Sequence, residues 1–181
     1  MSKIGEKFNP FPGLRPFNPE ESDFFFGRDN ESEDTIGKLL NKRFLAVIGA
    51  SGEGKSSLIN CGILPKITGL ASNSKVGWSV FSVRPGNDPA GNLAAELVKN
   101  ITDGDKKEYF HSEIIDILRN EHSGILRAID RLSFKPGERI LIIIDQFEEL
   151  FRYGSIENIK DPEKEIQRFV DLIVTAAEGN R

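Results

Sequence analysis

Cysteine and histidine are scarce in this sequence. Of its 181 residues, one is a cysteine, Cys61, and two are histidines. A single cysteine excludes a disulfide within the chain, and two widely spaced histidines cannot supply the thiolate and imidazole cluster of a zinc site. Any metal ion would therefore have to be held by oxygen ligands.

The sequence also lacks a long apolar run and a strong excess of one sign of charge. No segment approaches the roughly 20 apolar residues that cross a bilayer, and the N-terminus lacks the apolar core of a secretory signal. The 24 Lys and Arg residues against 28 Asp and Glu give a net charge of −4, without blocks of like charge. These absences argue against general binding to nucleic acid or to an anionic membrane, and we expect a cytoplasmic protein.

The composition is that of a folded chain, because 38% of the residues are hydrophobic and 29% are charged. The beginning differs from the rest: four of the nine prolines fall within residues 1–19, which prevents a helix or an inner strand there. Apolar anchors stand between these prolines: Phe8, Phe11, Leu14 and Phe17. We therefore expect an extended N-terminal arm and turn at residues 1–28, followed by a core at 29–181.

Short apolar runs alternate with helical patterns along this core. Strands are predicted at 44–48, 78–83 and 140–144, and the first and third should be buried on both faces because they are continuously apolar. Helices are predicted to begin near Asp29 or Asn30, near Lys55, at Pro89, after Ser123 and at Pro162, with another around 114–118. Pro65 should end the helix from Lys55. The pattern predicts an α/β fold of three layers with a mainly parallel sheet.

Residues 49–56, Gly-Ala-Ser-Gly-Glu-Gly-Lys-Ser, match the pattern GxxxxGK[ST] completely, and they stand between a predicted strand and a predicted helix. Backbone N–H groups at such a helix start bind phosphate oxygens, and glycines let the backbone bend round them. The candidate nucleotide-binding residues are Gly49, Ser51, Gly52, Gly54, Lys55 and Ser56, with Ser57 beside them. The alternative is that these residues form a turn that only connects the strand to the helix and binds no ligand.

Each side chain of this loop has an expected role. Lys55 should contact the β and γ phosphates, and the Ser56 hydroxyl should bind Mg²⁺. We expect the side chain of Glu53 to point to solvent and the side chain of Ser57 to bind no ligand.

Asp145 ends the third predicted strand. A protein that binds nucleotide through a phosphate loop, here residues 49–56, needs a second ligand for its metal ion at such a strand end. We expect Asp145 to hold Mg²⁺ through a water molecule, and Glu148 or Glu149 to polarise the water that attacks the γ phosphate. The pattern does not distinguish the two glutamates. Either could instead be a solvated residue that the helix dipole favours at a helix start.

The expected nucleotide is ATP rather than GTP. GTP-binding switches usually carry DxxG after this strand and NKxD further on. Here Asp145 is followed by Gln-Phe-Glu, and the lysine of the segment 158–161, Asn-Ile-Lys-Asp, stands one place late.

Several motifs, in this order, resemble the novel STAND NTPase family. They are 9–17 (Asn-Pro-Phe-Pro-Gly-Leu-Arg-Pro-Phe), 25–28 (Phe-Phe-Gly-Arg), the phosphate loop continued to Leu58, 62–65, 84–86 and 145–151 (Asp-Gln-Phe-Glu-Glu-Leu-Phe). The resemblance implies a signal-transduction ATPase, related to NACHT and NB-ARC switches, that oligomerises when a sensor region is engaged and activates an effector. Bacterial members often act in anti-phage or conflict systems. It also implies that Phe26, Gly27 and Arg28 lie near the adenine and ribose.

The sequence ends before some parts that the related ATPases contain. These are a sensor strand, which in the related sheet order lies between the phosphate-loop strand and the Asp145 strand, and the segments that close over the nucleotide. Three strands would leave a gap in the sheet or force a different pairing. We therefore expect part of a longer ATPase, or a chain that a partner completes, with weak ATP binding and very slow hydrolysis. Two other functions stay open: an interaction module that does not hydrolyse ATP, and a small phosphotransferase.

Overall fold

The computed structural model describes residue 13 and residues 15–73, 77–155 and 161–179. The chain divides into two compact units, Met1–Lys75 and Val76–Arg181, each of which is described by itself. The predicted anchors Phe8, Phe11 and Leu14 lie outside the described residues, as does the segment 158–160. The proposed division of the chain at residue 28 stays a prediction.

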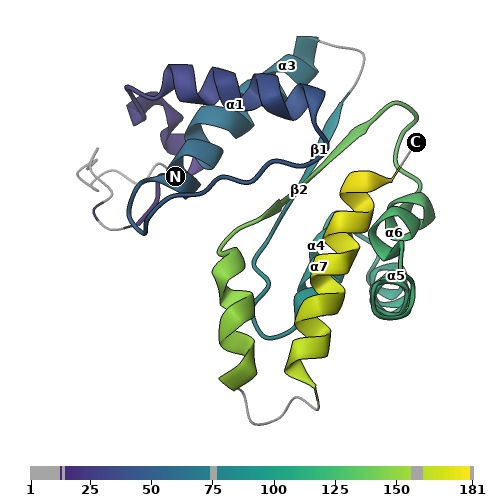
Figure 1. Ribbon diagram of the computed structural model, residues 1–181. Helices are drawn as coiled ribbons and strands as arrows, with labels where there is room; N and C mark the ends of the chain where they lie inside the picture. The colour runs from purple at the N-terminus through teal and green to yellow at the C-terminus, as the bar shows by residue number, and fades with distance from the viewer. Residues whose placement is uncertain (1–12, 14, 74–76, 156–160, 180–181) are drawn as a thin grey trace, which may run out of the picture. The chain divides into compact units, whose positions relative to one another are not determined.

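The described elements of the first unit are helices (Figure 1). They are the 3-10 helix η1 (Pro19–Phe24), α1 (Asp29–Asn41), α2 (Lys55–Ser57), the π-helix η2 (Leu58–Ile63) and α3 (Leu64–Asn73). The apolar side chains that become buried come from α1 and from the continuous run of helix after Lys55: Ile36, Leu58, Cys61, Ile63 and Ile67. This small core packs η2, which follows the phosphate loop and α2, against α1.

Pro65 does not end the helix that begins at Lys55, so that prediction was wrong. The helix passes through one π-helical turn, Leu58–Ile63, and continues as α3 from Leu64. Pro65 is thus the second residue of α3 and lies directly after the π-helical turn, where the regular helix hydrogen bonding is already interrupted and a residue without an N–H is tolerated.

Residues 44–48 form no strand, in contrast to the prediction. They run as an extended segment from the end of α1 to the phosphate loop (Figure 1), with Phe44 58% and Ile48 90% exposed. A strand requires a hydrogen-bonded neighbour, and within the described residues the sheet consists of two other strands. The segment therefore has the composition of a buried strand without the pairing that would bury it.

The second unit is built on two parallel strands, β1 (Trp78–Val83) and β2 (Arg139–Ile144), paired from Trp78 opposite Arg139 to Val83 opposite Ile144. Two predicted strands and their parallel direction are thereby confirmed. Four helices lie on one side of this sheet (Figure 1): α4 (Pro89–Leu97), α5 (Gly104–Asn120), α6 (Gly124–Leu132) and α7 (Pro162–Glu178). The fold is mixed α/β as expected, and an arrangement in three layers stays a prediction.

The core of the second unit lies between the sheet and these helices. Phe81 of β1 is 1% exposed, and it belongs to one cluster with side chains of these helices and of the 3-10 helix η3 (Phe147–Ser155): Leu93, Ile114, Leu118, Phe169 and, from η3, Leu150. Ile140, Ile142 and Ile144 of β2 pack against this cluster but are only partly buried. The prediction that β2 is buried on both faces was therefore wrong, because the helices of this unit cover one face of the sheet.

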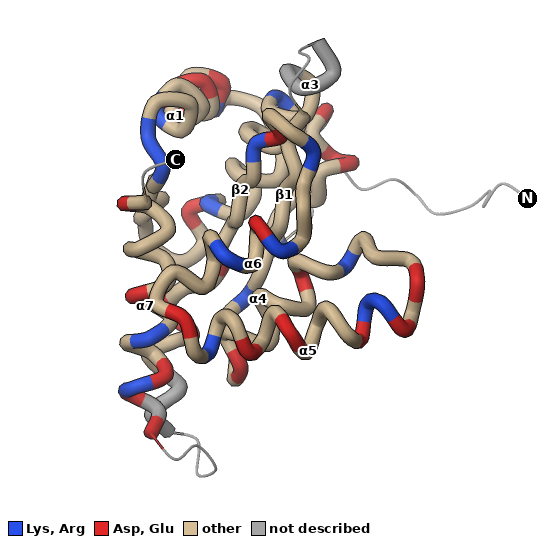
Figure 2. Tube along the Cα trace, turned by 90° about the vertical axis from the view of Figure 1, so that its right-hand side faces the viewer, with Lys and Arg blue, Asp and Glu red and all other residues tan. Residues whose placement is uncertain are grey.

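Charges of both signs are interspersed along the surface helices of this unit (Figure 2). Several are paired, as in Arg131 with Glu113 at 2.7 Å and Arg119 with Asp88 at 3.0 Å. Among the residues that the structure describes, none of the helices combines the length and the apolar character that crossing a membrane would require.

Candidate functional site

The loop at residues 49–56 folds back as a tight turn onto the start of α2. Gly52 and Gly54 have φ angles of +85° and +74°, in the left-handed region that glycine enters without strain. The Glu53 N–H donates to the Ala50 carbonyl at 3.3 Å, and the Leu58 N–H donates to the Gly54 carbonyl at 2.8 Å. The first bond closes the turn and the second begins the helix, so these glycines stand where the backbone needs them.

Lys55 is held over this turn. Its Nζ donates to the carbonyl oxygens of Gly49 at 2.8 Å and Ala50 at 2.9 Å. The loop therefore fixes a compact positive charge beside its own N–H groups, as binding of a phosphate would require.

Glu53 does not simply point to solvent. The residue is exposed, but its carboxylate accepts a hydrogen bond from the Ala50 N–H at 2.7 Å. A Cβ atom added at Gly49 would lie 2.3 Å from the Glu53 Oε2 atom, so the missing side chain of Gly49 leaves room for this contact. A loop N–H thus already binds a negatively charged oxygen, the kind of atom that a phosphate offers, and the loop fits such a ligand.

Arg28 is brought to the same loop. It follows Gly27, whose φ is +83°, and its Nη1 donates to the carbonyl oxygens of Glu53 at 2.9 Å and Gly54 at 3.4 Å. From the sequence, Arg28 and Phe26 were predicted to lie on the base side of a nucleotide. The bonds to the loop were not predicted, because they join residues 25 or more positions apart. Phe26 is 78% exposed.

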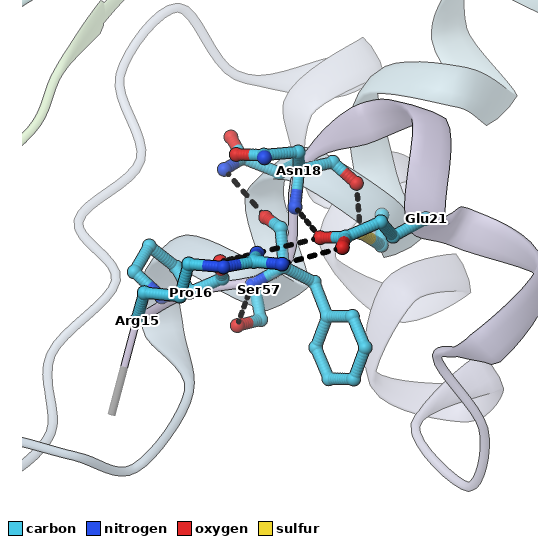
Figure 3. Close-up of polar contacts among 8 residues, drawn as sticks. Arg15, Pro16, Asn18, Glu21 and Ser57 are labelled. Atoms are coloured by element: carbon cyan, nitrogen blue, oxygen red, sulfur yellow. Dashed lines mark hydrogen bonds and ion pairs between the residues drawn. The ribbon is translucent and has the colours of Figure 1, made fainter. Parts of the chain in front are cut away.

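Ser57 is buried and contacts the N-terminal arm. Its Oγ accepts a hydrogen bond from the Phe17 N–H at 3.1 Å (Figure 3). Two residues of η2 also bind the arm: Asn60 Nδ2 donates to the Phe17 carbonyl at 3.0 Å, and Cys61 Sγ donates to the Asn18 carbonyl at 3.1 Å. The helix after the loop is therefore anchored to the arm, and the Ser57 hydroxyl serves that contact.

Charges stabilise the arm beside this contact. The Arg15 guanidinium donates to both carboxylate oxygens of Glu21, at 2.7 and 2.6 Å, and the Asn18 N–H donates to the same carboxylate at 2.8 Å (Figure 3). These bonds lower the pKa of Glu21 to about 2, and the bond from Arg15 has the largest effect. Burial raises the pKa of the Cys61 thiol, which keeps it protonated and suited to donate to Asn18.

Asp145 directly follows β2 in the second unit. Its N–H donates to the Val83 carbonyl at 2.9 Å, which extends the ladder with β1 by one residue. Its Oδ1 accepts from the Gln146 N–H at 3.0 Å, and its Oδ2 lies 3.5 Å from Arg84 Nη2. The side chain is 25% exposed, so the carboxylate lies at the carboxyl end of the sheet within reach of solvent.

Glu148 and Glu149 begin the 3-10 helix η3 (Phe147–Ser155), directly after the turn at Gln146. Glu148 is exposed and Glu149 is half-buried, while the neighbouring Leu150 is fully buried and anchors the segment. In the part of the chain that the structure describes, no three His, Cys, Asp or Glu side chains are grouped to hold a metal ion. Asp145 and Ser56 nevertheless offer oxygen atoms, the ligand type that Mg²⁺ prefers.

Comparison with protein families matched residues 10–181 to the family model described as Novel STAND NTPase 1. No curated protein and no solved structure gave a significant match. The family match reaches into both compact units and includes the phosphate loop, Asp145 and, apart from Asn9, the motifs that carried the resemblance. It implies a P-loop fold and a nucleotide as ligand. The chain belongs to the Novel STAND NTPase 1 family.

Proposed function

We propose that the chain binds ATP with Mg²⁺ at the loop 49–56 and acts in a signalling switch that hydrolyses ATP slowly. Bound ATP would favour self-association and activation of an effector, in bacteria as part of defence against phage. The observation that carries the proposal is the loop itself, in which Lys55 is held over the turn and a backbone N–H already binds a carboxylate oxygen. These contacts favour a loop that binds a phosphate chain over a turn that only connects two elements.

The proposed roles follow from the chemistry of each side chain. Backbone N–H groups of the loop surround the phosphates, and Lys55 neutralises charge on the β and γ phosphates. Ser56 and Asp145 are the proposed ligands of Mg²⁺, with the phosphates and water supplying its remaining oxygens. Gly27 and Arg28 are proposed to lie toward the base.

Hydrolysis requires a base for the attacking water. Glu148 or Glu149 is proposed to accept the proton as the water oxygen bonds to the γ phosphorus and the bond from that phosphorus to the bridging oxygen breaks. Bound Mg²⁺ would supply positive charge that offsets the charge on the phosphate oxygens. Ala50, Ser51, Gly52 and Glu53 are exposed, so phosphates held there stay partly solvated, which supports weak binding and slow turnover.

Isothermal titration of the chain with ATP and Mg²⁺ tests the binding step. We expect measurable heat with the wild-type chain and at least about tenfold weaker binding by the Lys55→Ala variant, which loses a charged hydrogen-bond donor. Absence of heat with the wild-type chain, or equal binding by the variant, would reject the proposed function and favour an interaction module.

Release of phosphate tests the hydrolysis step. One of the two variants Glu148→Gln and Glu149→Gln should lose most of the turnover while still binding ATP, because an amide cannot accept the proton. Full turnover in both variants would remove the proposed base. Turnover that requires an added acceptor would instead indicate a phosphotransferase.

A further inference from the structure

Arg28 uses both ends of its guanidinium to join the start of α1 to the phosphate loop. Nη1 donates to the carbonyl oxygens of Glu53 and Gly54 at 2.9 and 3.4 Å. Nε donates to the Glu31 carboxylate at 3.0 Å, and Nη2 donates to it as well. The side chain is 29% exposed; its bond to the Gly54 carbonyl is partly buried, and its bond to the Glu53 carbonyl is exposed.

Holding these two carbonyls determines where the neighbouring N–H groups point. A peptide unit is planar and trans, so its C=O and N–H point in opposite directions. The carbonyl of Glu53 shares a peptide unit with the N–H of Gly54, and the carbonyl of Gly54 shares one with the N–H of Lys55. A donor that binds both carbonyls therefore turns the N–H groups of Gly54 and Lys55 to the opposite side of the loop. Without it, the peptide unit of Glu53 and Gly54 would lose its fixed orientation, while that of Gly54 and Lys55 would keep only the bond from the Leu58 N–H at 2.8 Å.

The helix that carries Arg28 is itself fixed. Ser32, one turn further along α1, is 1% exposed, and its Oγ donates to the Arg28 carbonyl at 2.8 Å. A Cβ atom added at Gly62 of η2 would lie 2.2 Å from that Oγ, so α1 approaches η2 closely at a position where only glycine leaves room. Arg28 therefore reaches the loop from a rigid support.

We propose that Arg28 is a positioning residue of the phosphate loop, which orients the N–H groups of Gly54 and Lys55 toward the phosphates by holding the carbonyls of Glu53 and Gly54. This role rests on the proposed function, since it matters only if the loop binds phosphates. It is additional to the proposed place of Arg28 toward the base, because it acts on any ligand that has a phosphate chain.

The test compares binding of Mg-ATP with binding of Mg-tripolyphosphate, which has no base, at a temperature where circular dichroism shows every variant to be folded. Arg28→Lys keeps the positive charge but cannot hold Glu31 and both carbonyls at once. We expect it to bind both probes about tenfold more weakly. Glu31→Gln removes the partner that aims the guanidinium, and we expect both probes to bind about two- to fivefold more weakly. Lys38→Ala, at an exposed residue of the same helix, is the control and should bind both probes like the wild-type chain.

The alternatives give different results. If Arg28 acts only through a contact with the base, Arg28→Lys weakens binding of ATP and leaves binding of tripolyphosphate unchanged. If Arg28 only attracts phosphates through its charge, Arg28→Lys binds like the wild-type chain, and Glu31→Gln binds both probes more tightly because a negative charge is gone. Either result would overturn the positioning role while the proposed function stands. A wild-type chain that binds neither probe would overturn both.

Discussion

Glu53 places a negative charge within the loop that is proposed to bind phosphates. Its carboxylate accepts the Ala50 N–H at 2.7 Å, so it uses a donor of the loop and repels an approaching phosphate. We expect Glu53→Gln to bind ATP about three- to tenfold more tightly at low salt, as titration calorimetry would measure.

The matched control for Glu53→Gln is Asp34→Asn, which removes the same charge from an exposed position on α1 and should leave the affinity unchanged. Weaker binding by Glu53→Gln would show that the carboxylate supports the shape of the loop more than it repels the ligand. Sequence reasoning assigned this residue no function, because the pattern GxxxxGK[ST] leaves its position open.

The stability of the N-terminal arm depends on pH through the ionisation of Glu21. The hydrogen bonds from Arg15 and then from the Asn18 N–H lower its pKa from the usual 4.5 to about 2. Because the pKa is lower in the folded chain, the carboxylate stabilises the arm fully above pH 4.5, and this contribution is lost as the pH falls toward 2. A carbon NMR titration of the Glu21 carboxyl should show the low pKa.

Arg15→Gln should raise the pKa of Glu21 toward its usual range, since the first cause of the shift is removed. Arg43→Gln changes an exposed arginine of the same unit and should leave the titration as it is. A Glu21 carboxyl that titrates near 4.5 in the wild-type chain would mean that the contact with Arg15 does not persist in solution.

The two strands of the sheet differ in how their outer edges are covered. On β1, the Ser82 N–H donates to Glu96 Oε1 at 2.8 Å, and the Val80 carbonyl accepts from Lys99 Nζ at 3.3 Å. Glu96 of α4 and Lys99, which follows α4, thus occupy backbone groups that another strand would need. On β2, the N–H groups of Arg139 and Asp145 bind β1, and the regular ladder puts those of Ile140, Ile142 and Ile144 on the opposite edge.

Hydrogen exchange read by NMR should therefore alternate along β2. We expect the amides of Leu141 and Ile143, which bind β1, to exchange at least about tenfold more slowly than those of Ile140, Ile142 and Ile144. Ser82, on the outer edge of β1, serves as the comparison, because its amide is hydrogen-bonded and should be slower than those three. Equal protection along β2 would indicate that another segment pairs with its outer edge.

At the scale of elements, local chemistry made some features predictable and others not. The helix starts predicted at Pro89 and Pro162 are confirmed: the aspartates before these prolines accept helix N–H groups at 2.9 and 3.3 Å, and a cap and its partner are only three residues apart. The run at 44–48 looks equally clear in the sequence, but a strand depends on a distant partner, and within the described residues none pairs with it. The bonds from Arg28 to the loop are missed for the same reason.

The whole molecule has two compact units, each with its own buried side chains. In the second unit, Phe81, Leu93, Leu118 and Phe169 belong to one cluster formed by residues of that unit, and a chain segment of about 100 residues is long enough to bury such a core. We therefore expect residues 76–181 to fold when produced alone, with a cooperative thermal transition followed by circular dichroism.

Two variants of that fragment test whether its core is the one described. Leu118 is fully buried, so Leu118→Ala should lower the free energy of unfolding by about 2–5 kcal/mol. Val174, 47% exposed on α7, provides a matched truncation of an apolar side chain, and Val174→Ala should cost less than about 1 kcal/mol. A fragment without a cooperative transition would mean that this core needs residues 1–75 to form. Equal losses in the two variants would mean that Leu118 is not at its centre.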